Sequence, residues 1–191
     1  MKKSSSQISH WQQLGKQMLY DTSYFQLWSR RMRSPSGHFE SDFFYIDAVN
    51  WVNVIAITSE NEVVMVEQFR HGIQETSLEI PGGMLDADHE DPEEGARREL
   101  LEETGFAAQR MESLGFIHPN PAIQSNRNYS YFSENVTRVS SQQLDIAEDI
   151  AVHLIPLAEI PGLIESHQIT HALVVNAFAR LFIRRPELLT R

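Results

Sequence analysis

Acidic side chains recur at short intervals between residues 82 and 106, where the chain reads GGMLDADHEDPEEGARRELLEETGF. Glu99, Glu102 and Glu103 are spaced so that a helix would place all of them on one face. Neighbouring carboxylates repel one another. A divalent cation such as Mg²⁺, or Mn²⁺ in its place, prefers hard oxygen ligands and would neutralise them. A solvated acidic face is the alternative, and it is the commoner case for an acidic helix taken alone.

The residues on either side predict where this helix begins and ends. Asp91 suits the N-cap position, and Pro92 suits the first helical position. Gly105 suits the residue that ends a helix in a left-handed conformation. We therefore expect a helix from about Pro92 to Thr104.

The same stretch resembles the Nudix box, the signature of a family of hydrolases. The box reads glycine, five residues, glutamate, seven residues, and then Arg-Glu-apolar-any-Glu-Glu-any-Gly-apolar. Residues 98–106 match its second half, and seven residues separate Glu90 from Arg98. Six residues separate Gly83 from Glu90, one more than the pattern has, so we interpret loop 85–89 as carrying a one-residue insertion.

The resemblance implies an α/β (α+β) fold, namely an α/β/α sandwich with a mixed sheet and an added N-terminal antiparallel β-hairpin or sheet. We expect residues 1–49 to form the N-terminal β extension, which serves dimerisation and the nucleotide pocket, and residues 50–191 to form the Nudix domain. Aromatic residues and a Ser-Pro-Ser-Gly turn predict a hairpin over residues 20–47. Residues 10–20 are interpreted as a short amphipathic segment.

By resemblance, the box supplies the metal ligands. Glu99 and Glu103 are expected to bind Mg²⁺ or Mn²⁺ directly, and the carbonyl group of Gly82 joins them. Glu102 is a ligand or an outer-shell partner, and it is expected, with Glu103, to take part in catalysis. Glu148, in a late loop, is the candidate general base, metal ligand or both. A solvated loop acid is the alternative for Glu148.

Arg98 has two interpretations that the sequence leaves open. The resemblance implies that it tethers loop carboxylates such as Glu90. An ordinary helical pair with Glu102, four residues later, is equally consistent with the spacing.

Residues before the box suggest the kind of substrate. The segments Glu67-Gln68-Phe69-Arg70 and Glu79-Ile80-Pro81-Gly82-Gly83 are similar to those of ADP-ribose and nucleotide-sugar hydrolases. Arg70 would then contact the diphosphate or a ribose, since a guanidinium offers paired donors to phosphate oxygens. A salt bridge at the end of a strand is the alternative, and Glu79 is expected to be a buried structural partner.

Other residues are candidates for contacts with the substrate. Trp51 and Trp28 are candidates for stacking on the base, although packing in a core or a dimer interface is the alternative for each. Met84 and Asn126 are further candidates. Asn126 stands where the resemblance leads one to expect a carboxylate, which favours a looser preference among nucleotide sugars.

The expected reaction is therefore hydrolysis of the diphosphate bond of ADP-ribose or a related nucleoside diphosphate sugar. The products would be a nucleoside monophosphate and a sugar phosphate. One alternative is hydrolysis of another nucleoside diphosphate derivative, such as a dinucleotide or a dinucleoside polyphosphate. The other is a non-catalytic Nudix domain that senses a nucleotide.

Composition narrows the partners. The 191 residues carry a formal net charge of −10, which disfavours nucleic acid and anionic membranes as partners. There is no cysteine, so disulfides, zinc thiolate sites and a cysteine nucleophile are excluded. Without an apolar run long enough for a signal peptide or a membrane span, we expect a cytoplasmic protein. Through the aromatic residues of segment 20–50 we expect a homodimer.

Overall fold

The structure is a computed structural model that describes residues 8–86 and 90–190. The chain divides into two compact units. The first comprises Met1–Ala48 and Asn120–Asn126, and the second comprises Val49–Pro119 and Arg127–Arg191. No helix of the described residues is long and apolar enough to cross a membrane.

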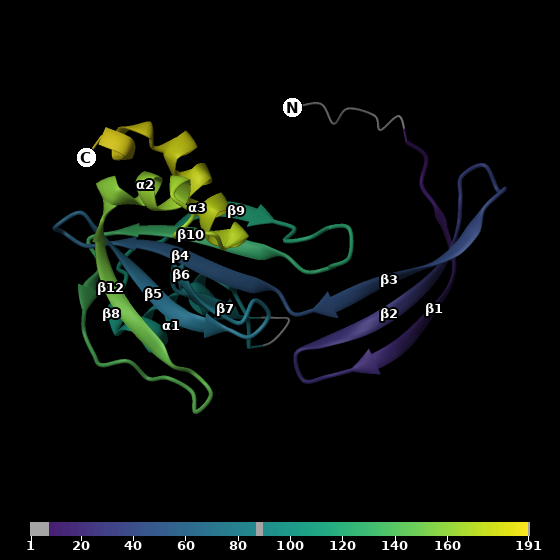
Figure 1. The fold of residues 1–191 in the computed structure, drawn as a ribbon, viewed down its shortest axis with the longest axis horizontal. Coiled ribbons are helices and arrows are strands. Elements are labelled where there is room, and N and C mark those ends of the chain that lie inside the picture. Colours follow the sequence, from purple (N-terminus) through teal and green to yellow (C-terminus); the bar gives the residue numbers. More distant parts are fainter. Residues whose placement is uncertain (1–7, 87–89, 191) are drawn as a thin grey trace. The chain divides into compact units, whose positions relative to one another are not determined.

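The first unit contains an antiparallel sheet with the order β1-β2-β3 (Figure 1). Its strands are β1 (Gln12–Asp21), β2 (Phe25–Arg33) and β3 (Glu40–Ala48). The expected N-terminal antiparallel sheet is therefore confirmed, but residues 12–21 form a strand rather than an amphipathic segment. That strand escapes detection because nearly all of its side chains are exposed, so it shows no alternation of buried and exposed positions.

The second unit is built on a mixed sheet with the order β12-β5-β4-β10-β9. Strand β6 pairs with β5 and β7 pairs with β4, both antiparallel, whereas β10 runs parallel to β4. The bounds of these strands are β4 (Trp51–Ile57), β5 (Glu62–Arg70), β6 (Glu75–Glu79), β7 (Gly82–Met84), β9 (Glu112–Ile117), β10 (Asn128–Glu134) and β12 (Ile150–Pro156). A separate pair consists of β8 (Phe106–Ala107) and β11 (Thr137–Arg138).

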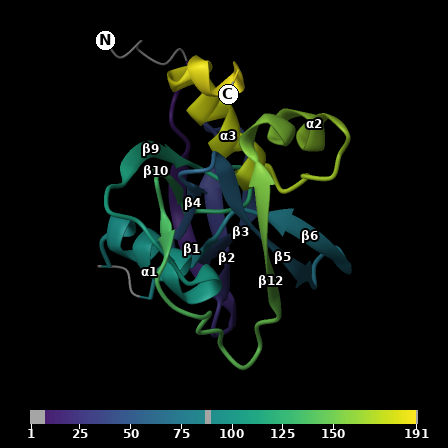
Figure 2. The ribbon, with the colours of Figure 1, turned by 90° about the vertical axis from the view of Figure 1, so that its left-hand side faces the viewer.

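Helices cover both faces of this sheet. In Figure 1, α1 (Pro92–Thr104) lies on one side of β4 and β5, and α3 (Ala172–Arg184) lies on the other; Figure 2 shows the molecule turned by 90°. The remaining helical segments are η1 (Leu157–Glu159), α2 (Ile160–Glu165) and η2 (Pro186–Thr190). The α/β/α sandwich with a mixed sheet is thereby confirmed.

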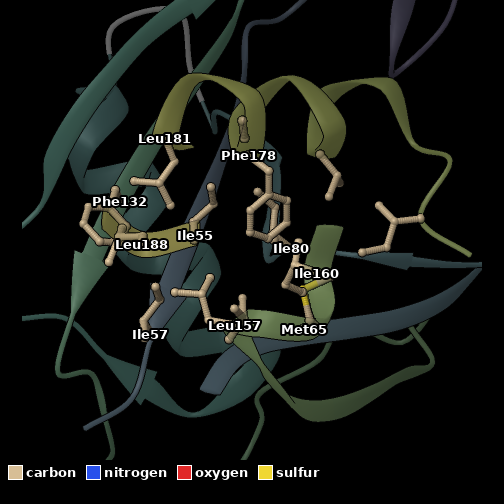
Figure 3. Close-up of a cluster of buried hydrophobic side chains, with 14 of the residues drawn as sticks. Ile55, Ile57, Met65, Ile80, Phe132, Leu157, Ile160, Phe178, Leu181 and Leu188 are labelled. Atoms are coloured by element: carbon tan, nitrogen blue, oxygen red, sulfur yellow. The ribbon is translucent and has the colours of Figure 1, made fainter. Parts of the chain in front are cut away.

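Strand β4 contributes side chains to two separate hydrophobic cores, because successive side chains of a strand point to opposite faces. Its residues Ile55 and Ile57 pack with Phe178 and Leu181 of α3 (Figure 3). Its residues Val52, Val54 and Ala56 pack with Ala96 and Leu100 of α1. A strand buried on both faces reads as a continuous apolar run, which is why this strand was predictable from sequence.

Helix α1 has the predicted ends. The Asp91 side chain accepts a hydrogen bond from the amide of Glu93 at 2.8 Å, and Pro92 is the first helical residue. Gly105 ends the helix with φ of 74°. A Cβ atom at this glycine would lie 2.2 Å from the carbonyl oxygen of Ser140, so both the conformation and the close approach require glycine.

Candidate active site

A cavity of about 720 Å³ lies in the second unit, a size typical of ligand sites. Its walls come from the acidic face of α1, the ends of β4, β5, β6 and β10, strand β7, the loop before β12, and the N-terminal turn of α3. Most of the residues predicted from sequence line this one cavity: Trp51, Arg70, Gly82, Met84, Glu99, Glu102, Glu103 and Glu148.

Trp28 and Asn126 belong to the first unit and are not among the residues that line the cavity. The Nζ atom of Lys16 lies 3.7 Å from the centre of the Trp28 ring, so a lysine occupies one face of this indole. Their substrate contacts stay predictions.

Glu103 is almost fully buried at the cavity, with 3% of its surface exposed. Its Oε2 atom accepts a hydrogen bond from the amide of Gly82 at 2.9 Å. Burial raises the pKa of Glu103 to about 8, and the negative charges of Glu99 and Glu148 act in the same direction. The Gly82 amide opposes this shift without cancelling it.

Glu99 lies one helical turn before Glu103 and is also buried. Burial raises its pKa to about 7, against the opposing influence of Arg98. A Cβ atom at Gly83 would come within 2.6 Å of the Glu99 Oε1 atom. The second glycine of the Gly82-Gly83 pair therefore lets this carboxylate lie directly against the backbone of β7.

Arg98 meets both expectations for it at once. Its guanidinium donates to Glu90 at 3.2 Å and to the carbonyl oxygen of Met84 at 3.0 Å. It also donates to Glu102 at 3.1 Å and to Glu99 at 2.9 Å. The two interpretations of the sequence are thus not exclusive, because one guanidinium has five N–H groups in a fixed fork. Arg98 ties the loop after β7 to the acidic face of α1.

The remaining two carboxylates are more open to solvent. Glu102 is half-exposed and its only described ion pair is with Arg98. Glu148 is exposed and lies in a turn of its own loop, where its Oε2 atom accepts from the amide of Asp145 at 3.1 Å. The loop carrying the insertion, 85–89, borders the site, but residues 87–89 lie outside the described residues.

Arg70 also lines the cavity and is held by Glu79. The Nε and Nη2 atoms of Arg70 donate to the two carboxylate oxygens of Glu79, both at 2.7 Å. Burial is the largest influence on the pKa of Glu79 and acts to raise it, but the hydrogen bonds and charge of Arg70, with smaller contributions from His171 and Ser77, together lower it. His171, at the N-cap of α3, lies 3.7 Å from Glu79, and burial lowers its pKa. Glu79 is therefore a buried partner that orients Arg70, as the sequence suggested.

The side chains of the cavity suit a divalent cation in the chemistry of their donors. Glu99, Glu102, Glu103 and Glu148 supply only hard oxygen ligands, which Mg²⁺ and Mn²⁺ prefer. The raised pKa values of Glu99 and Glu103 show that negative charge is held at a disadvantage here, and a cation relieves that disadvantage. Within the described residues no three acidic or histidine side chains already stand as a closed metal cluster.

Without metal, the protein should become less stable as the pH rises from about 5 to about 8. Glu99 and Glu103 have folded-state pKa values above the value of 4.5 that applies to the unfolded chain. In this window the folded state keeps protons that the unfolded state has released, so the free energy of unfolding falls as the pH rises. Thermal unfolding in a chelator at several pH values tests this, and a melting temperature that climbs across the window would contradict it.

Several lining residues were not predicted. Asn53 and Asn128 are almost fully buried on the adjacent strands β4 and β10, and His171 and Gln143 also line the cavity. A signal existed for Asn53, since it is a polar residue inside an apolar strand. His171 and Gln143 have no local signal, because only the fold brings them to the cavity.

Comparison with protein families gives one match. The model of a family described as the NUDIX domain matches residues 49–178, which is more than half of the chain.

Known proteins also resemble the chain. The ADP-ribose pyrophosphatase of Bacillus subtilis (strain 168) is 27% identical over 172 residues, which cover 90% of this chain and 92% of that protein. The methanol dehydrogenase activator of Bacillus methanolicus is 39% identical over 106 residues, or 56% of each chain. A solved structure titled as an ADP compounds hydrolase superposes with a TM-score of 0.83 at 19% identity. It covers 96% of this chain and 98% of its own, and it shows the same fold.

Proposed function

The chain belongs to the Nudix hydrolase family, and from this premise we propose that it hydrolyses the diphosphate bond of ADP-ribose or a related nucleoside diphosphate sugar. The products would be a nucleoside monophosphate and a sugar phosphate. One observation carries the proposal: the carboxylates of Glu99, Glu102, Glu103 and Glu148 line the same cavity as the guanidinium of Arg70. That arrangement pairs a site for cations with a donor for phosphate oxygens.

The relatives support this class of substrate. The ADP-ribose pyrophosphatase of Bacillus subtilis aligns with 90% of the chain. The ADP-sugar pyrophosphatase of Mus musculus is 36% identical over 80 residues, 41% of this chain. We therefore place ADP-ribose and ADP-sugars first among the substrates to be tested.

In the proposed site, Glu99 and Glu103 would hold Mg²⁺ or Mn²⁺, Glu102 would hold it directly or through water, and the carbonyl group of Gly82 would join them. A bound divalent ion lowers the charge repulsion met by the attacking water and polarises the phosphoryl group. The amide of Gly82 keeps the Glu103 carboxylate in one orientation. Arg98 holds the Glu99 and Glu102 side chains beside it.

We assign the proton transfer to Glu148, whose exposed carboxylate borders the cavity and would accept the proton of the attacking water. Arg70, fixed by Glu79, would donate to the diphosphate or to a ribose. Trp51 and Met84 line the cavity and would contact the base. We also propose that Trp28 and Asn126, which belong to the first unit, contact the substrate.

We also propose a homodimer formed through residues 20–50. Six aromatic side chains of the first unit are exposed there: Tyr20, Tyr24, Phe25, Phe39, Phe43 and Phe44. Large exposed apolar patches are uncommon on monomers and mark interaction sites. Light scattering at micromolar concentration should give the mass of a dimer, and the mass of one 21.9 kDa chain would contradict the proposal.

A panel of substrates tests the proposed reaction. Initial rates are measured with ADP-ribose, GDP-mannose, a UDP-sugar, NAD⁺ and a diadenosine polyphosphate, each with Mg²⁺, with Mn²⁺ and with a chelator. We expect the fastest metal-dependent release of a nucleoside monophosphate from a nucleoside diphosphate sugar. Faster hydrolysis of NAD⁺ or the polyphosphate would show that the preferred substrate is not a nucleoside diphosphate sugar. Binding of ADP-ribose without turnover would indicate a sensor and refute the proposed reaction.

A further inference from the structure

The segment Val139–Asp149 joins β11 to β12 and has no strand or helix of its own. Three of its residues, Gln143, Asp145 and Glu148, line the cavity. A segment without regular structure needs contacts elsewhere to hold a side chain in a defined place. The contacts of this segment therefore decide where Glu148 stands relative to the glutamates of α1.

The first part of the segment is attached to the C-terminal end of α1. The amides of Val139 and Ser140 donate to the carbonyl oxygen of Gly105 at 2.8 and 3.2 Å. The amide of Gln143 donates to the carbonyl oxygen of Glu102 at 2.8 Å. The last carbonyl groups of a helix have no partner within the helix, and the segment supplies partners for carbonyl groups at the end of α1.

The side chain of Gln142 connects the end of α1 to the start of β12. Its Nε2 atom donates to the carbonyl oxygen of Glu103 at 2.7 Å and to that of Ile150 at 3.0 Å. An amide nitrogen has two hydrogens, and both are engaged here. One half-buried side chain thus joins the helical residue that carries the Glu103 carboxylate to the first residue of β12, two positions after Glu148.

Between these anchors, the described hydrogen bonds of residues 144–149 are those of their own turn. The amide of Glu148 donates to the carbonyl oxygen of Asp145 at 3.0 Å, and the amide of Asp145 donates to the Glu148 carboxylate. Among the described residues, no hydrogen bond or ion pair joins residues 144–149 to another element. The position of the turn therefore depends on how the residues before and after it are held. Gln142 links these two ends, because its side chain bonds both α1 and the first residue of β12.

We propose that Gln142 is a positioning residue, whose side-chain amide fixes the Glu148 turn relative to Glu102 and Glu103. The inference deepens the proposed function, since it rests on those carboxylates acting together in hydrolysis. Gln142 itself has its amide on backbone carbonyl groups and is not among the cavity-lining residues. Its effect on the reaction is accordingly indirect.

Gln142→Met tests the proposal, because methionine has a similar length and no N–H donor. We expect kcat for the best substrate to fall roughly tenfold and the metal concentration for half-maximal rate to rise by a similar factor. KM should change by less than about twofold, since Arg70 and Trp51 are untouched. Amide hydrogen exchange at Asp145 and Glu148, whose amides form the hydrogen bonds of the turn, should become faster. Ser141→Ala, at an exposed neighbouring position, is the matched control and should behave as the wild type.

Gln142→Glu is a second variant, which keeps the shape of the side chain but places a carboxylate oxygen against the carbonyl oxygens of Glu103 and Ile150. The fall in kcat should therefore be larger for Gln142→Glu than for Gln142→Met. Rates of both variants within about twofold of the wild type would overturn the proposal. A fall in rate at an unchanged half-maximal metal concentration would also overturn it, because loss of folded protein alone gives that result. If the wild type hydrolyses no substrate, the proposed function fails separately. In that case the exchange comparison still decides, and equal exchange in wild type and Gln142→Met refutes the role of Gln142.

Discussion

Replacing Glu103 with glutamine should lower the rate of hydrolysis by about 10³-fold and leave the fold intact. The glutamine Oε1 atom can still accept the hydrogen bond that the Gly82 amide now gives to Glu103. The charge that would hold a cation is lost. Because burial raises the pKa of Glu103 to about 8, a neutral amide should also suit the metal-free fold at least as well as the carboxylate. Steady-state rates and melting temperatures, with and without Mg²⁺, measure both effects.

Glu94→Gln is the matched control for this variant. Glu94 lies on the same helix, its side chain is 71% exposed, and its ion pair with Arg97 spans 3.9 Å. Its replacement should leave the rate within about twofold of the wild type, as expected for an exposed charge. Full activity of Glu103→Gln with Mg²⁺ would remove Glu103 from the metal site.

Arg70→Ala should lower the free energy of unfolding by about 3 kcal/mol near pH 8, in addition to its effect on substrate. The Glu79 side chain is 4% exposed, and both of its oxygens accept from Arg70. Without Arg70, the buried Glu79 carboxylate keeps only His171 at 3.7 Å, whose own pKa is lowered, so the pKa of Glu79 rises. The folded variant then binds a proton that the unfolded chain has released, so its deficit in stability grows as the pH rises above 4.5. Chemical denaturation of wild type and variant at about pH 5 and about pH 8 measures this difference.

Two further variants test whether the Glu79 charge causes the loss of stability in Arg70→Ala. Arg31→Ala removes exposed ion pairs with Glu40 and Asp42, and should cost less than about 1 kcal/mol at either pH. Adding Glu79→Gln to Arg70→Ala removes the unpaired charge and should recover part of the stability at pH 8. A deficit for Arg70→Ala that is equal at both pH values would contradict the account of Glu79.

The sequence predicted those elements whose signals are local. Helix α1 could be placed to the residue because Asp91, Pro92 and Gly105 mark its ends, and each acts within one turn. Strand β4 was predictable because both of its faces are buried. Strand β1 was missed because it is exposed on both faces, so its pairing with β2 decides its structure rather than its composition.

The residues of the candidate site also fall into those with a local signal in the sequence and those without one. The acidic face of α1 follows from helical spacing, and the roles of its glutamates follow from resemblance to the Nudix box. The contacts of Arg98 with Glu90 and Glu102 were predicted, whereas its contact with Asp86 was not, because Asp86 stands in the loop at a position that the box leaves undefined. Gln142 had no signal at all, because one of its partners lies 39 residues earlier in the chain and is a backbone carbonyl group.

The most direct test of the central claim is the fate of ADP-ribose in ¹⁸O-enriched water. The wild type is incubated with ADP-ribose and Mg²⁺, and the products are identified by mass spectrometry. We expect AMP and ribose 5-phosphate in equal amounts, with one ¹⁸O atom in one of the two phosphates, and we expect about 10³-fold less of both products from Glu103→Gln in the same time. Intact ADP-ribose after incubation, or products formed equally well by Glu103→Gln, would contradict a diphosphate hydrolase centred on α1.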